Sequence, residues 1–148
     1  MAITKANYLK ANSAGVRDRL ARSIRYYTWR GSGERAGRRT QPRGWVRDDG
    51  RALPWLAVRD CAGAEVAVYR YCYRIVLSTR ETPLGFADYQ AALGTRFARW
   101  YLVQHHDGGH PHAHVIAFTE RRLGRGDLAG QRARLLAREQ SRAQSWGR

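Results

Sequence analysis

The sequence contains only two cysteines and no apolar run that approaches the roughly 18 residues of a membrane-spanning helix. Cys61 and Cys72 fit no paired metal-binding spacing, so we expect both to be small buried hydrophobic residues without chemistry. No signal-peptide pattern precedes the first polar residues. These absences argue against a transmembrane protein and a cysteine-based metal site. They predict a soluble, cytoplasmic protein with no membrane partner.

Acidic residues are also few, with 12 Asp and Glu against 27 Lys and Arg, and the formal net charge is +15. Almost all of the positive charge is arginine, whose planar guanidinium suits bidentate contact with phosphate better than a lysine ammonium does. This charge excess predicts a polyanionic partner. The lack of a membrane span favours nucleic acid over an anionic membrane.

The apolar pattern predicts an α+β fold, with an antiparallel sheet that carries helices on one face. The 148 residues are typical of a single domain. We expect it to span residues 1–126 and to be followed by a basic tail, residues 127–148, with a weak helix that contact with a partner would order. The predicted elements are helices over 13–27 and 86–97, strands over 66–77, 99–106 and 112–118, and a long basic loop over 31–54.

All five histidines lie around an Asp-Gly-Gly turn in the stretch HHDGGHPHAHV, which begins at residue 105. Side chains alternate across a strand, so His112 and His114 project from one face with Cα atoms roughly 6.6 Å apart. If the flanking strands form a hairpin, a residue opposite His112 shares this face. That residue is His105 or His106, because the register of the hairpin is open by one position.

Three neutral imidazoles on one side of a divalent ion leave its other coordination positions open, which is the arrangement of a catalytic ion that polarises a phosphate oxygen. Asp107 and His110 lie close enough in sequence to orient a ligand ring by hydrogen bonding. The alternative interpretation is a pair of surface histidines beside a turn, which needs no ion. A cupin-like metal enzyme is disfavoured, since Glu120 lies one position too far from His112 and His114.

The histidine stretch resembles the third motif of conjugative relaxases, the HUH single-strand DNA endonucleases that nick plasmid or T-DNA origins. That motif runs His-x-Asp-x-x-His-Pro-His-x-His, followed by apolar residues. The resemblance implies that His105, His112 and His114 hold the ion, and it selects His105 over His106 by analogy only. It also implies an HUH-endonuclease-like fold with the histidine hairpin in the central strands.

The segment YYTWRG at residues 26–31 is similar to the Tyr-x-x-Arg segment that carries the relaxase nucleophile. The spacing implies that Tyr27 attacks and that Arg30 assists, with Tyr26 as the second candidate for the nucleophile. Tyr27 also continues the apolar stripe of the first predicted helix, so a core position at the helix end is the competing interpretation. The family often has Asn a few positions after the last histidine, where this chain has Phe118.

As a whole, the resemblance implies a metal-dependent single-strand DNA nickase and strand transferase for plasmid mobilisation, with a 5′-phosphotyrosyl intermediate. Mg²⁺ or Mn²⁺ is the expected cofactor, and Zn²⁺, Ni²⁺ or Co²⁺ could replace it in a crystal. The expected partner is single-stranded DNA at an origin-like site, with or without an accessory protein. Basic loops and exposed aromatic rings would hold the strand, through Trp29, Arg35, Arg38, Arg39, Arg43 and Trp45. The alternatives are a replication initiator or transposase relative, and a basic nucleic-acid-binding protein without catalysis.

Overall fold

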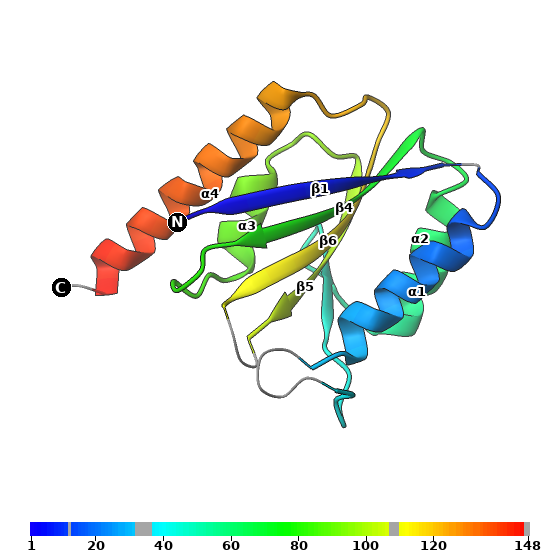
Figure 1. The fold of residues 1–148 in the computed structure, drawn as a ribbon, viewed down its shortest axis with the longest axis horizontal. Helices are drawn as coiled ribbons and strands as arrows, with labels where there is room; N and C mark the ends of the chain where they lie inside the picture. The colour runs from blue at the N-terminus through cyan, green and yellow to red at the C-terminus, as the bar shows by residue number, and fades with distance from the viewer. Residues whose placement is uncertain (12, 32–36, 107–109, 147–148) are drawn as a thin grey trace.

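A computed structural model of the 148-residue chain describes every residue except 12, 32–36, 107–109 and 147–148 (Figure 1). In chain order the elements are β1 (Ile3–Lys10), α1 (Val16–Trp29), β2 (Trp45–Arg47), β3 (Ala52–Leu53), α2 (Trp55–Glu65), β4 (Tyr71–Ser78), α3 (Phe86–Leu93), β5 (Arg99–His105), β6 (His112–Thr119) and α4 (Arg125–Trp146). Within the described part of the chain, none of the helices has the length and apolarity that crossing a membrane requires.

Six strands form one sheet in the order β1-β4-β6-β5-β2-β3, and every neighbouring pair is antiparallel. β5 and β6 are consecutive in sequence and paired in space, with β6 lying between β4 and β5. The predicted α+β fold with an antiparallel sheet is therefore confirmed, and the two histidine-bearing strands lie at its centre.

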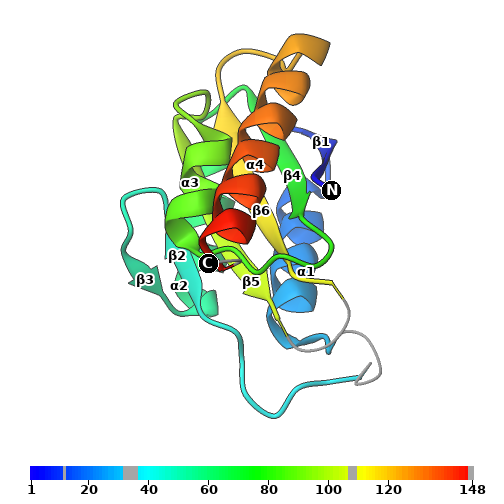
Figure 2. The same cartoon turned by 90° about the vertical axis from the view of Figure 1, so that its left-hand side faces the viewer.

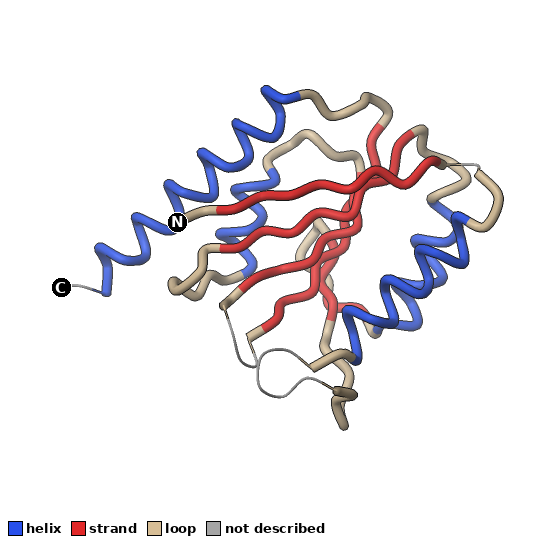
Figure 3. The backbone as a smooth tube through the Cα atoms, in the orientation of Figure 1, coloured by secondary structure: helices blue, strands red, loops and turns tan. Residues whose placement is uncertain are grey.

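Helices cover both faces of the sheet, with α1 and α2 on one side and α3 and α4 on the other (Figures 2 and 3). The expectation that helices pack on one face only is wrong. Successive residues of β6 explain why, since Val115 is buried in one core and Ile116 in the other. A sheet that is apolar on both faces needs a helical layer on each to remove those side chains from water.

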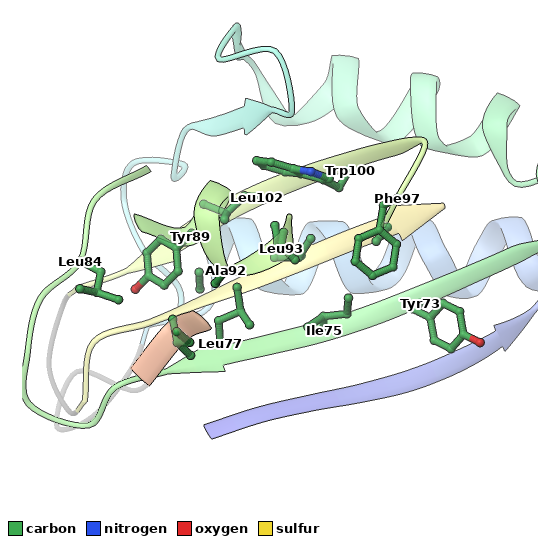
Figure 4. Packing of buried hydrophobic residues seen from close by; sticks show 14 of the residues in the cluster. Tyr73, Ile75, Leu77, Leu84, Tyr89, Ala92, Leu93, Phe97, Trp100 and Leu102 are labelled. Carbon is green, nitrogen blue, oxygen red and sulfur yellow. The ribbon is translucent and has the colours of Figure 1, made fainter. Parts of the chain in front are cut away.

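The core beneath α3 and α4 is buried and apolar, and Figure 4 shows the packing of side chains from β4, β5 and α3 within it. Leu135 anchors α4 in this core and has no exposed surface. Arg138 and Arg142 of the same helix lie 2.8 and 3.1 Å from the carboxylate of buried Asp88. The helix predicted after residue 127 is therefore present, and it packs on the rest of the chain.

The loop predicted over 31–54 is partly wrong, because it contains the short strands β2 and β3, and β2 pairs with β5. Two longer elements on the side of α1 and α2, β1 and α2 itself, were not predicted either. β1 lies at the edge of the sheet, where half of its residues are exposed and only Leu9 is buried, so its apolar pattern is weak. α2 follows the Gly- and Arg-rich segment and buries only small or branched side chains, at Val58, Ala62 and Gly63. Neither element presents the repeated large apolar residues on which periodicity depends.

Three further expectations differ from the structure in detail. The strand predicted over 66–77 begins only at Tyr71, because Val66 ends α2. The helix predicted to reach residue 97 ends at Leu93, where Gly94 takes a positive φ of 64° that favours glycine. Cys72 is buried as expected, whereas Cys61 is exposed on α2.

Candidate metal centre

The β5–β6 pairing brings three histidines together at one end of the sheet. His105 lies directly opposite His112, and His114 follows two residues later on the same face of β6. Their ligand nitrogens all lie within 4.8 Å of one another, and the ring centroids are 4.6 to 5.1 Å apart. This trio could hold a metal ion. The register also decides between the adjacent histidines, since His105 belongs to the trio and His106 is exposed outside it.

Main-chain carbonyl groups orient two of the three rings. His105 Nε2 lies 2.9 Å from the carbonyl oxygen of Tyr27, and His112 Nδ1 lies 2.8 Å from that of His110. A carbonyl oxygen can only accept, so each of these nitrogens carries the proton and the lone pair of the neutral ring is on the opposite nitrogen. Hydrogen bonds of this kind fix the tautomer and orientation of metal-binding histidines.

His114 is held neutral by its surroundings. Burial lowers the pKa of His114 to about 3, with smaller contributions from the other two histidines and Arg43. A neutral imidazole is the form that binds a metal. Its Nδ1 is buried and has no hydrogen-bond partner within the described residues. A buried polar atom is costly when it lacks a partner, so the trio fits a bound cation better than it fits a purely structural role.

Tyr27 contacts the trio with both its ring and its main chain. Its ring stacks on that of His114 at a centroid distance of 4.0 Å and an interplanar angle of 10°. Its carbonyl oxygen accepts the hydrogen bond from His105. The buried stripe of α1, with Leu20 and Ile24, continues at Thr28, so half-buried Tyr27 sits at the edge of the core and above the histidines.

A basic cavity opens beside Tyr27. It measures about 450 Å³ and is lined by Arg19, Arg22, Ser23, Tyr26, Tyr27 and Arg74. Arg74 reaches it from β4, where its Nη1 donates to Ser23 Oγ at 3.0 Å, while its Nε is buried without a partner within the described residues. Sequence reasoning gave Arg74 no role. The sequence does mark it as unusual, because it is an arginine within an otherwise apolar strand, on the same strand face as Cys72.

The surroundings of the Tyr27 hydroxyl have opposing effects on its pKa. Burial raises the pKa of Tyr27, and Tyr26 adds to the rise, while the positive charge of Arg74 opposes it. The phenol is therefore protonated at neutral pH, and any reaction through its oxygen requires that the proton leave. Tyr26 is different in kind, because its side chain is 58% exposed and its ring meets that of Tyr27 only edge-on, at 6.3 Å.

Two residues predicted to bind DNA are buried instead. Trp45 is 1% exposed and its indole donates to Thr28 Oγ1 at 2.9 Å. Arg43 is 6% exposed and its guanidinium donates to the carbonyl oxygens of Tyr27 and Arg30. The last carbonyl groups of a helix need such donors. Arg43 and Trp45 thus fix the end of α1 that carries Tyr27, and the expectation of a surface role for them is wrong.

The remaining predicted residues lie around the same helix end. The Arg38 guanidinium lies 4.9 Å from the ring centroid of Trp29, and Arg39 donates to the Gln41 carbonyl oxygen. Arg30 is exposed and lines a cavity that Tyr27 does not line. The structure does not bring Arg30 into the cavity beside Tyr27, contrary to the expectation that it assists there.

The residues expected to orient the ligand rings are only partly described. The His110 ring lies 2.8 Å from the Arg80 carbonyl oxygen, and this residue supports His112 through its own carbonyl group instead of its side chain. Asp107 and the predicted DNA contact Arg35 lie outside the described residues.

Comparison with known proteins does not assign the chain to a family. No protein family, curated protein or solved structure is significantly similar to this chain. The site therefore has to be judged by its own geometry, which is three convergent imidazoles, a phenol stacked on one of them and an arginine-lined cavity beside the phenol.

Proposed function

We propose that the protein is a metal-dependent single-strand DNA nickase and strand transferase of the relaxase type, with Tyr27 as its nucleophile. One observation carries the proposal, namely that Tyr27 stacks on the ring of His114 while its carbonyl group binds His105. The phenol and the histidine trio are thus one structural unit built from α1, β5 and β6.

His105, His112 and His114 would hold the ion. When bound, a divalent ion draws electron density from a phosphate oxygen and so eases attack on phosphorus. Three imidazoles are a nitrogen-only donor set, whereas Mg²⁺ prefers oxygen ligands. Among the expected cofactors, we therefore propose Mn²⁺ ahead of Mg²⁺, with Zn²⁺, Ni²⁺ and Co²⁺ also accepted.

In the proposed reaction the phenolic oxygen of Tyr27 attacks a DNA phosphodiester. The new bond joins this oxygen to phosphorus, and the bond from phosphorus to the 3′ oxygen breaks. The phenol loses its proton and the departing 3′ oxygen gains one, so a 3′-hydroxyl and a 5′-phosphotyrosyl link result. Attack by a 3′-hydroxyl on that link reverses the step and rejoins or transfers the strand.

Arg74, which lines the same cavity from β4, supports the chemistry. Its charge lowers the pKa of Tyr27 against the effect of burial, which favours loss of the phenolic proton. The same guanidinium, with those of Arg19 and Arg22, can neutralise the phosphate that enters. The single strand, with or without an accessory protein, is the proposed partner because its phosphates are accessible one at a time to such a cavity.

Covalent capture tests the proposal. Incubation of the protein with Mn²⁺ and a pool of labelled single-stranded oligonucleotides should give a denaturation-resistant protein–DNA adduct. Tyr27→Phe should abolish the adduct because the attacking oxygen is removed, and EDTA should do the same. Tyr26→Phe, the matched control on the neighbouring residue, should retain it.

Two outcomes would contradict the proposal. An adduct that persists in Tyr27→Phe would show that another residue attacks. Absence of any adduct in the native protein, with DNA binding that EDTA does not change, would support a nucleic-acid-binding protein without catalysis and would end the nickase proposal.

A further inference from the structure

A second cavity of about 340 Å³ lies along the C-terminal half of α1. It is lined by Arg22, Arg25, Tyr26, Trp29, Arg30 and Arg38. We infer that this cavity holds one base of single-stranded DNA, next to the phosphate that Tyr27 attacks. The inference rests on the proposed function, and it names the part of the substrate that this surface recognises.

Two aromatic side chains form the apolar part of the cavity. Tyr26 and Trp29 are three residues apart on α1, so they lie on the same side of the helix. Tyr26 is 58% exposed, which is far more than a packing role requires. An exposed ring that lines a cavity beside a second ring offers a surface on which a nucleobase can stack.

The charge around the two rings indicates which class of ligand the cavity would bind. Among the residues that the structure describes, all the other lining residues are arginines and none carries a carboxylate. The Arg38 guanidinium already packs over the Trp29 ring, so one cation is held against the aromatic part of the cavity. A nucleotide supplies both groups that this surface accepts, since its base is a flat ring and its flanking phosphates are anions. An acidic peptide supplies the anions alone.

The base cavity and the Tyr27 cavity share two residues, Arg22 and Tyr26. A strand with one base against Tyr26 therefore has its neighbouring phosphate beside Tyr27 and Arg74. This assigns different roles to the two adjacent tyrosines. Tyr27 stacks on a histidine of the trio and attacks, whereas Tyr26 stacks on the DNA and positions it.

Fluorescence anisotropy with a labelled oligothymidylate of about 12 nucleotides tests the inference. The measurement is made in EDTA, so that no cleavage occurs and binding alone is read. Tyr26→Ala should weaken binding by about 5-fold to 100-fold, as loss of one base–aromatic stack does. Tyr26→Phe keeps the aromatic face and should bind like the native protein. Tyr8→Ala, which removes an exposed ring from β1, should also bind normally.

Two control ligands distinguish stacking of a base from contact with phosphates. A duplex of the same length should bind with the same affinity to the native protein and to Tyr26→Ala, because its bases are not free to stack. Polyglutamate should likewise be insensitive to Tyr26→Ala. The inference would be overturned if Tyr26→Ala weakened binding of the duplex or of polyglutamate as much as it weakens binding of the single strand.

The inference and the proposed function can fail separately. Tyr27→Phe should bind the oligonucleotide normally and form no adduct. If Tyr26→Ala binds like the native protein while the native protein still forms its adduct, the base cavity is wrong and the nickase stands. If Tyr26→Ala loses affinity but the native protein forms no adduct, the base cavity stands and the nickase is wrong.

Discussion

The face of the sheet beneath α3 and α4 is lined by one apolar cluster, whereas the face beneath α1 and α2 changes from apolar to polar along β5 and β6. On β6, Ala113 and Val115 enter the first core, and their neighbours His112 and His114 form the candidate centre on the other side. The same two strands therefore build a closed core with one set of alternating residues and a chemical site with the other set.

This difference shows how the site is held in place. On one face, burial of apolar surface and the docking of α4 stabilise the fold. On the other, the end of α1 is fixed by Arg43 and Trp45, and this places Tyr27 over the histidines. Substitutions in the core beneath α3 and α4 should change stability and leave the site intact, while substitutions of the side chains that form the histidine site should change chemistry more than stability.

His114→Ala should have the largest effect on chemistry. It removes one of three proposed ligands and the ring on which Tyr27 stacks, so we expect no detectable adduct. Affinity for Mn²⁺ should fall more than about 100-fold, since loss of even a supporting hydrogen bond costs roughly 10- to 100-fold. Isothermal titration calorimetry checks the affinity. His106→Ala, outside the trio, should bind Mn²⁺ normally, and equal affinity in both variants would refute the site.

Leu135→Ala should have the largest effect on stability. The side chain is fully buried between α4 and the sheet, so its truncation should lower the free energy of unfolding by about 2–5 kcal/mol. Urea unfolding followed by circular dichroism measures this change. Leu136→Ala is the matched control, because Leu136 is 38% exposed and should cost about 0.5 kcal/mol or less. The folded Leu135→Ala protein should still bind Mn²⁺ with native affinity.

Arg74→Gln should slow the chemistry without changing the fold. We expect the single-turnover rate of adduct formation at saturating DNA to fall about 100-fold, the lower end of the range for loss of a group that stabilises developing charge. Arg17→Gln removes the same charge from an exposed position on α1 and should leave the rate unchanged. Equal slowing by both variants would point to a general effect of net charge.

Asp88→Asn should reduce the sensitivity of the fold to acid. Burial raises the pKa of the Asp88 carboxyl, but the Gly85 N–H and the guanidinium groups of Arg138 and Arg142 outweigh it, and the pKa lies below its ordinary value. The carboxylate therefore stabilises the fold above its unfolded pKa of about 3.9, and this contribution is lost as pH falls through the folded value.

Urea midpoints measured from about pH 6 downward should show the effect, with the loss of stability confined to pH below about 4. The fall should be smaller in Asp88→Asn than in the native protein. An identical fall in the two proteins would show that the ion pairs of α4 do not contribute.

The sequence predicted the histidine trio because strand alternation places His112 and His114 on one face whatever the rest of the fold does. It could not choose His105 over His106 without the resemblance, since a register change of one residue exchanges them. It missed α2 and β1, where few large apolar residues repeat, and the short strands β2 and β3 within the predicted loop. It also misplaced Trp45, because burial of one aromatic in a segment rich in Gly and Arg depends on tertiary packing with α1.

Mass-spectrometric mapping of the protein–DNA adduct tests the central claim most directly. After digestion with a protease and a nuclease, the peptide that carries residual nucleotide is sequenced to locate the modified side chain. A 5′-phosphate on the oxygen of Tyr27, formed only when Mn²⁺ is present, is the predicted result. Attachment to Tyr26 or to any other residue would contradict the account.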